Sequence, residues 1–239
     1  MPSTRGSSAV EPCRMRIVRH SGVRRWPPEG CRRPRRVSVR TRKEGARMRL
    51  FAAAVPPREA VAELRAAVAA AREPAGRRPA PAEPAGLRWT DPAGWHVTVA
   101  YYGEVGEERL PGLHERLAAV AAAREPFVLR LAGGGTFGER VLWAGLAGQT
   151  AALHDLAVAA AVAGPAAGGY DAYRPHLTLA LAARGAAPGP AVPGPPLGAL
   201  AAALGGFAGR TWRVGRLVLM RSEADHRYSE RAAWPLGVP

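Results

Sequence analysis

Residues 96–99 read HVTV and residues 176–179 read HLTL, so a pattern of His, apolar residue, Thr, apolar residue occurs twice in this 239-residue chain. In an extended strand, side chains two positions apart project from the same face. Each motif therefore predicts a strand with an imidazole and a hydroxyl on one face and apolar residues on the other. With six His and eight Thr in the chain, chance predicts only about 0.04 such motifs.

Strand and helix patterns alternate from Met48 onward around the two motifs. The apolar spacing predicts strands at 48–55, 87–90, 96–103, 127–132, 140–146, 176–182, 212–220 and 228–235, and helices at 57–72, 107–123, 149–163 and 197–204. A glycine run at 133–135 predicts a bend and does not match a phosphate-binding loop. Because strands outnumber crossover helices, we expect a mixed or antiparallel sheet.

The motifs lie 80 residues apart, and each follows a predicted helix, which indicates an internal duplication. We expect an α/β (α+β) fold of two duplicated lobes. In this fold two mixed or antiparallel sheets line a central cleft, helices lie on the outside, and one His–Thr pair faces the cleft from each lobe. Residues 48–239 are enough for one such two-lobed domain with a hydrophobic core.

The formal net charge of +15 at first indicates a binder of nucleic acid or of anionic membranes. Residues 1–47, however, hold 14 of the 34 Lys and Arg residues and only three of the 19 Asp and Glu residues. They lack periodicity and apolar material, so we expect a disordered basic extension. It is an arm that contacts RNA, an Arg-rich targeting segment, or translated upstream sequence that the native protein lacks. We favour the last, because Met48 opens the first predicted strand.

Both cysteines, Cys13 and Cys31, lie in that extension. The remaining chain has no thiol for a disulfide or a thiolate metal site, which suits a reducing cytoplasm. No apolar run has the length of a membrane helix, and no apolar core follows the early arginines as in a secretory signal. We expect a cytoplasmic protein without a membrane partner, and nothing in the sequence demands more than a monomer.

The paired motifs resemble those of the two-histidine phosphoesterase superfamily, and their flanks resemble the bacterial RNA 2',3'-cyclic phosphodiesterases (the ThpR/LigT family). The matching stretches are MRLF at 48–51 with prolines at 56–57, WHVTVAYYGEV at 95–105, RVLWAGL at 140–146 and YRPHLTLA at 173–180. The resemblance spans residues 48–239. It implies a bilobal fold with a central cleft and hydrolysis of 2',3'-cyclic phosphate ends of RNA to 2'-phosphomonoesters. It implies neither a metal nor a cofactor, and family members were also regarded as RNA ligases.

Such a hydrolysis needs a base for the water proton and an acid for the departing oxygen, and two imidazoles can supply both. The resemblance makes His96 the acid and His176 the base, although the sequence alone does not fix which is which. Thr98 and Thr178 can donate hydrogen bonds to the phosphate oxygens as negative charge develops. These four residues are the expected catalytic set.

Substrate-binding residues are less sharply defined. Relatives commonly carry an arginine five residues after the second His, where this chain has Leu181. Arg184 is the nearest residue that could bind the phosphate in its place, and Arg88 and Arg174 are weaker candidates. Arg184 could equally be a solvated loop residue. Three aromatic residues could stack an RNA base at the cleft mouth or belong to the core, namely Tyr102, Phe137 and Tyr173.

Two other functions remain open at this point. The histidines could ligate a metal in a hydrolase, but no Asp or Glu lies within either motif and no His-Glu-x-x-His pattern occurs. A non-catalytic RNA-binding protein could instead rely on the basic arm, which predicts a steep salt dependence of binding and no turnover.

Overall fold

The computed structural model describes residues 46–73, 87–164, 173–182, 197–223 and 227–238. Nearly all of the predicted basic extension 1–47, the Pro-rich loops and Arg184 lie outside the described residues. The described elements belong to one compact unit, Arg42–Pro239. No described helix is long and apolar enough to cross a membrane.

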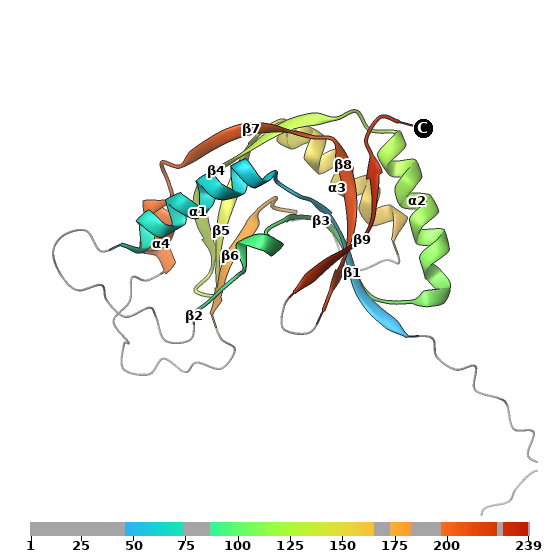
Figure 1. Ribbon diagram of the computed structural model, residues 1–239, viewed down its shortest axis with the longest axis horizontal. Coiled ribbons are helices and arrows are strands. Elements are labelled where there is room, and N and C mark those ends of the chain that lie inside the picture. Colours follow the sequence, from blue (N-terminus) through green and yellow to red (C-terminus); the bar gives the residue numbers. More distant parts are fainter. Residues whose placement is uncertain (1–45, 74–86, 165–172, 183–196, 224–226, 239) are drawn as a thin grey trace, which may run out of the picture. The chain divides into compact units, whose positions relative to one another are not determined.

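Nine described strands form a single sheet (Figure 1). They are β1 (Arg47–Ala54), β2 (Leu87–Trp89), β3 (Val97–Gly106), β4 (Phe127–Phe137), β5 (Val141–Gly148), β6 (Leu177–Ala182), β7 (Ala208–Val214), β8 (Arg216–Ser222) and β9 (Tyr228–Pro235). The order is β7-β4-β5-β6-β3-β1-β8-β9, with β2 pairing to β6. All of these pairs are antiparallel.

The sheet divides into two halves at the β6–β3 pair. The His96 half contains β3, β1, β8 and β9, and the His176 half contains β6, β5, β4 and β7 together with β2. Between β6 and β3, the register joins a single pair, Val97 and Leu177. The expected two-lobed α/β arrangement is confirmed, but the two expected sheets are one curved sheet.

The described helices are α1 (Arg58–Arg72), α2 (Leu110–Ala122), α3 (Thr150–Ala163) and α4 (Leu197–Ala203), with 3-10 turns η1 (Pro92–Gly94) and η2 (Glu107–Arg109). Buried residues recur at helical spacing, as at Leu113, Leu117 and Ala121 of α2. Helices α2 and α3 pack on the His96 half, whereas α1 and α4 pack on the His176 half (Figure 1). The main core therefore lies between the helices and one face of the sheet.

Two predictions about local structure were wrong. The run 212–220 is not one strand, because Val214 pairs with β4 whereas Arg216 pairs with β9. The chain thus changes from one half of the sheet to the other at Gly215. The predicted bend at 133–135 lies inside β4, where the register against β5 shifts between Leu131 and Gly134.

Candidate active site

The antiparallel register brings the two motifs together. Val97 lies opposite Leu177, and both side chains are fully buried in the main core. In an antiparallel pair, the residue before one partner lies next to the residue after the other. The register therefore places His96 beside Thr178 on the face of the sheet opposite that core. By the same rule, His176 lies beside Thr98.

His96 is held by its own backbone and by two aromatic rings. Its Nδ1 lies 2.8 Å from the carbonyl oxygen of Gly94, which can only accept a hydrogen bond. Nδ1 therefore carries a proton, and Nε2 of the neutral imidazole is available to take one. The ring centroid lies 4.7 Å from that of Phe51 and 4.8 Å from that of Tyr228.

His176 repeats this local geometry in the other half. Its Nδ1 lies 2.7 Å from the carbonyl oxygen of Arg174, so the same tautomer is favoured. Its ring meets Phe137 edge-on at 4.8 Å between centroids, and Trp143 lies 6.5 Å away. In both motifs a histidine donates to the carbonyl two residues earlier and stands beside two aromatic side chains.

Burial makes protonation of His96 unfavourable. It lowers the pKa of this imidazole below its ordinary value of 6.5, and the hydrogen bond to Gly94 opposes the shift. The charge of His176 lowers the pKa of His96 further, because two like charges repel each other. The two imidazoles are therefore close enough for a charge on His176 to act on His96.

Thr90, which the sequence did not point to, connects the two motifs. Its Oγ1 lies 2.9 Å from the carbonyl oxygens of both Thr178 and Leu179, and its backbone N–H donates to Leu179 at 2.9 Å. The same Oγ1 accepts a 2.9 Å hydrogen bond from Nε1 of Trp95, a buried residue next to His96. One side chain thus fixes the segment before the first motif to the strand of the second.

The three aromatic residues predicted to bind substrate lie in different surroundings. Phe137 lies beside His176, as described above. Tyr173 donates a 2.9 Å hydrogen bond from its hydroxyl to the carbonyl oxygen of Thr98 and so ties the segment before β6 to β3.

Tyr102 was wrongly predicted to stack a base. It is only 3% exposed, and its hydroxyl donates to the carbonyl oxygen of Ala160 in α3. Two register shifts between β3 and β1 break the strict alternation from Thr98, so Tyr102 points into the core.

The arginine candidates remain predictions. Arg184 lies outside the described residues. Leu181 lies in β6, paired with Arg88 of β2 on one side and with Val141 of β5 on the other. Arg88 and Arg174 are both exposed.

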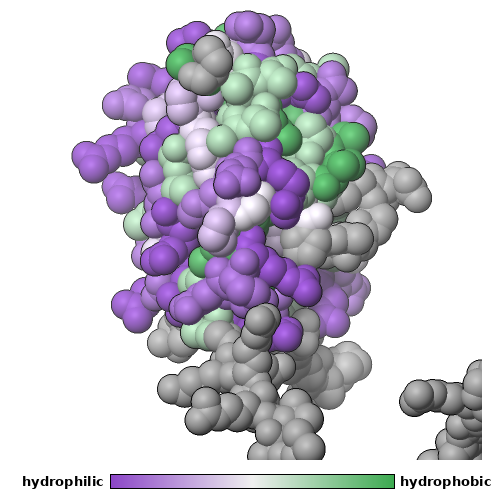
Figure 2. All heavy atoms as spheres, turned by 90° about the vertical axis from the view of Figure 1, so that its right-hand side faces the viewer, coloured by the Kyte–Doolittle hydropathy of each residue, from purple (hydrophilic) through white to green (hydrophobic). Residues whose placement is uncertain are grey.

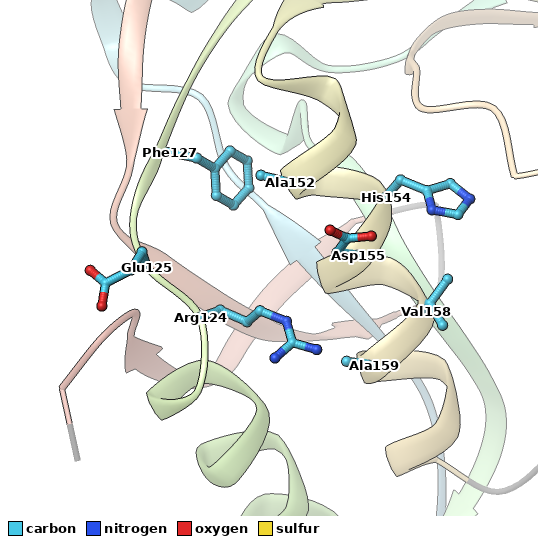
Figure 3. A pocket seen from close by; sticks show the side chains of 8 residues that line it. All are labelled: Arg124, Glu125, Phe127, Ala152, His154, Asp155, Val158 and Ala159. Atoms are coloured by element: carbon cyan, nitrogen blue, oxygen red, sulfur yellow. The ribbon is translucent and has the colours of Figure 1, made fainter.

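A cavity of about 550 Å³ lies away from the motifs, between the end of α2 and the first turns of α3 (Figure 3). Its lining includes Arg124, Glu125, His154 and Asp155 but no motif residue. Figure 2 looks onto the side where α2 lies and shows apolar surface among hydrophilic surface. The cavity does not join the histidine site, because no motif residue lines it. Within the described part of the chain, no group of three or more His, Cys, Asp or Glu residues could hold a metal ion.

Comparison with known proteins relates the chain to phosphoesterases. The family model described as LigT like Phosphoesterase matches residues 53–143, which include the first motif. The RNA 2',3'-cyclic phosphodiesterase of Geobacillus stearothermophilus is 35% identical over 161 residues, covering 63% of this chain and 48% of the relative. That of Archaeoglobus fulgidus is 37% identical over 65 residues, 26% of this chain and 36% of the relative. The chain spans about half the length, or less, of these curated relatives.

Solved structures extend the similarity over the fold. Crystal structures of E. coli LigT and of a Thermus thermophilus protein each align with a TM-score of 0.57 and cover 80% of this chain and 99% of their own. Their identities are 23% and 27%, respectively. The chain is thus similar to the LigT-like phosphoesterases over residues 53–143, and it has the fold of these solved structures. The resemblance seen in the sequence is confirmed.

Proposed function

We propose that the chain hydrolyses 2',3'-cyclic phosphate ends of RNA or nucleotides to 2'-phosphomonoesters. The observation that carries the proposal is the antiparallel pair Val97–Leu177, which brings two His–Thr pairs to one face of the sheet. The names of the two curated relatives support the same activity. No described feature favours a metal-dependent hydrolase or a non-catalytic RNA binder.

The two imidazoles can perform the proton transfers of this reaction. His176 takes a proton from water as its oxygen bonds to phosphorus, and His96 gives a proton to the 3'-oxygen as the P–O3' bond breaks. The products are a 2'-phosphate and a 3'-hydroxyl, and the two imidazoles have exchanged protonation states. Thr98 and Thr178 donate hydrogen bonds to the non-bridging oxygens, where negative charge increases in the transition state.

The assignment of His96 as the acid requires the substrate. In the free protein, burial favours its neutral form, because the pKa of His96 is lowered. An anionic phosphate beside Nε2 favours the protonated form instead. Substrate binding therefore raises the proton affinity of His96, which it needs in order to act as the acid. The five-membered ring of the substrate is strained, so positioning and proton transfer can suffice without a metal.

The phosphate also needs a counter-charge. Arg184 is the candidate we retain, because it follows β6 three residues after Leu181 and could bond the phosphate through its guanidinium. We further propose that the chain acts as a monomer, since each His–Thr pair comes from the same chain.

The test is hydrolysis by the full-length chain of cytidine 2',3'-cyclic phosphate and of an RNA with a 2',3'-cyclic end, in the presence of EDTA. We expect turnover of both, with a 2'-phosphate as the product identified by phosphorus NMR. A 3'-phosphate product, activity lost to the chelator, or no turnover would each contradict the proposal.

A further inference from the structure

Two neighbouring cavities meet where β1 ends and α1 begins. The first, of about 480 Å³, lies between α1 and η1, and the second, of about 740 Å³, lies between the start of α1, the β7–β8 junction and the end of β9. Val55, Pro56 and Arg58 line both cavities, so they adjoin. We call the pair the arginine groove.

Arginine is the only charged residue type that lines the arginine groove among the described residues. Arg58 and Arg65 line the first cavity, and Arg58, Arg213 and Arg216 line the second, with no Asp or Glu in either lining. The cavity beside α3 differs, because Glu125 and Asp155 accompany its arginine (Figure 3). The charge of the groove is thus a local feature and not only a result of the arginine-rich composition.

Most of these guanidinium groups are available to a ligand. All four arginines are exposed, and Arg58, Arg65 and Arg213 form no ion pair with another described residue. Arg216 lies 3.3 Å from a carboxylate oxygen of Glu230, in a pair that is itself exposed and therefore weak. The groove would attract a polyanion.

Tryptophans lie among the arginines. Trp95 lines the first cavity, and Trp212 and Trp234 line the second. Trp95 and Trp212 are buried, and the half-buried Trp234 packs edge-on against His114 with 5.6 Å between the ring centroids, so the three indoles form an apolar floor. A positively charged groove over an apolar floor suits the phosphodiester backbone of single-stranded RNA.

The groove begins next to the first motif, because Val55 lines both cavities and follows Ala54, which pairs with Val97 beside His96. We infer that the arginine groove binds the phosphodiester backbone of the RNA strand that carries the cyclic end. This inference rests on the proposed function and names its substrate class, an RNA strand in preference to a mononucleotide.

The test compares two substrates in single-arginine variants of the full-length chain. Arg58→Gln and Arg213→Gln are measured against Arg109→Gln, which removes the same charge from η2, outside the groove. For a cyclic-ended RNA of about ten nucleotides, each groove variant should raise KM on the order of threefold to tenfold at low salt. KM and kcat for cytidine 2',3'-cyclic phosphate should stay within about twofold. Residues 1–45 are present in every variant, so any contribution that they make to RNA binding is common to all the variants compared.

Binding of the same RNA with an unreactive 3'-hydroxyl end, followed by fluorescence anisotropy, separates the inference from the proposed function. Each groove substitution should reduce the slope of log Kd against log salt by about one, and Arg109→Gln should not. RNA binding that depends on these arginines, without hydrolysis, would contradict the proposed function but not the arginine groove. Hydrolysis with equal KM changes for both substrates, unchanged RNA binding, or equal displacement by a poly-aspartate peptide of matched charge would overturn the groove.

Discussion

The two halves of the sheet present the same four-residue pattern in different surroundings. In the His96 half, Phe51 and Tyr228 belong to a small apolar cluster on the face opposite the main core, and the imidazole packs against both. That cluster buries His96 and lowers its pKa. The protonation of this histidine is therefore set by residues outside its motif.

The His176 half builds its side of the site differently. Trp143 lies opposite Thr178 in the register, so both side chains project from the same face. The indole covers Gly135 of β4 so closely that a Cβ there would collide with it. Glycine in this strand thus makes room for an aromatic wall beside His176, where the other half uses a packed cluster. Because different residues surround the two similar motifs, the two imidazoles can serve one as the acid and the other as the base.

The largest expected effect tests whether both halves are needed. His96→Ala and His176→Ala should each lower kcat for a cyclic-ended RNA by about 10² to 10⁴-fold, because each removes one proton-transfer group. Circular dichroism of the variants would verify the fold. Near-normal turnover in either variant would show that one histidine suffices and would contradict the assignment of one imidazole as the acid and the other as the base.

The next effect concerns the hydroxyls. Thr98→Val and Thr178→Val keep the shape of the side chain but remove the hydroxyl that we propose as a donor to the phosphate, so kcat should fall by roughly 10² to 10³-fold with a smaller change in KM. Thr→Ser at each position retains the hydroxyl and should recover most of the rate. If valine and serine variants behaved alike at one position, the hydroxyl of that half would have no part in the reaction.

Much of the fold could be predicted, because it depends on local patterns. The apolar spacing of α1 and α2 and the alternation around both motifs gave elements close to those observed. The division at Gly215 could not be predicted, since the apolar run continues through it. Only the distant partners of Val214 and Arg216, in β4 and β9, show that two strands meet there.

The site shows the same limit. The spacing of the two motifs predicted His96, Thr98, His176 and Thr178 as site residues, but the neighbours of these residues come from distant strands. Tyr228 reaches His96 from β9, and nothing in its local sequence marks it. Phe51 was hidden in a run of apolar residues, where either face could have been the core.

A smaller effect should come from the connection between the halves. Thr90→Val removes the acceptor for the buried Trp95 N–H, which should cost about 1–3 kcal/mol of unfolding free energy. Because the same hydroxyl positions the Thr178 backbone, kcat should fall roughly tenfold while KM changes less. Urea unfolding and steady-state kinetics measure the two effects separately.

Thr90→Ser is the matched control for this connection, because it retains the hydroxyl and should restore kcat. A Thr90→Val protein that lost stability but kept full kcat would show that Thr90 supports the fold without positioning the second motif.

The smallest effect tests the origin of the asymmetry. The pKa of His96 is lowered by folding, so the unfolded chain binds more protons than the native protein between the native pKa and about 6.5. The neutral form of His96 therefore favours the native state. Its contribution to the free energy of unfolding is fully present above about pH 6.5 and is lost as the pH falls through the native pKa of His96. His96→Gln has no titrating group, so the difference in unfolding free energy, wild type minus variant, should decrease from about pH 7.5 to about pH 5. Parallel pH dependences would mean that the aromatic cluster does not set the proton affinity of His96, and the two halves would then differ in shape alone.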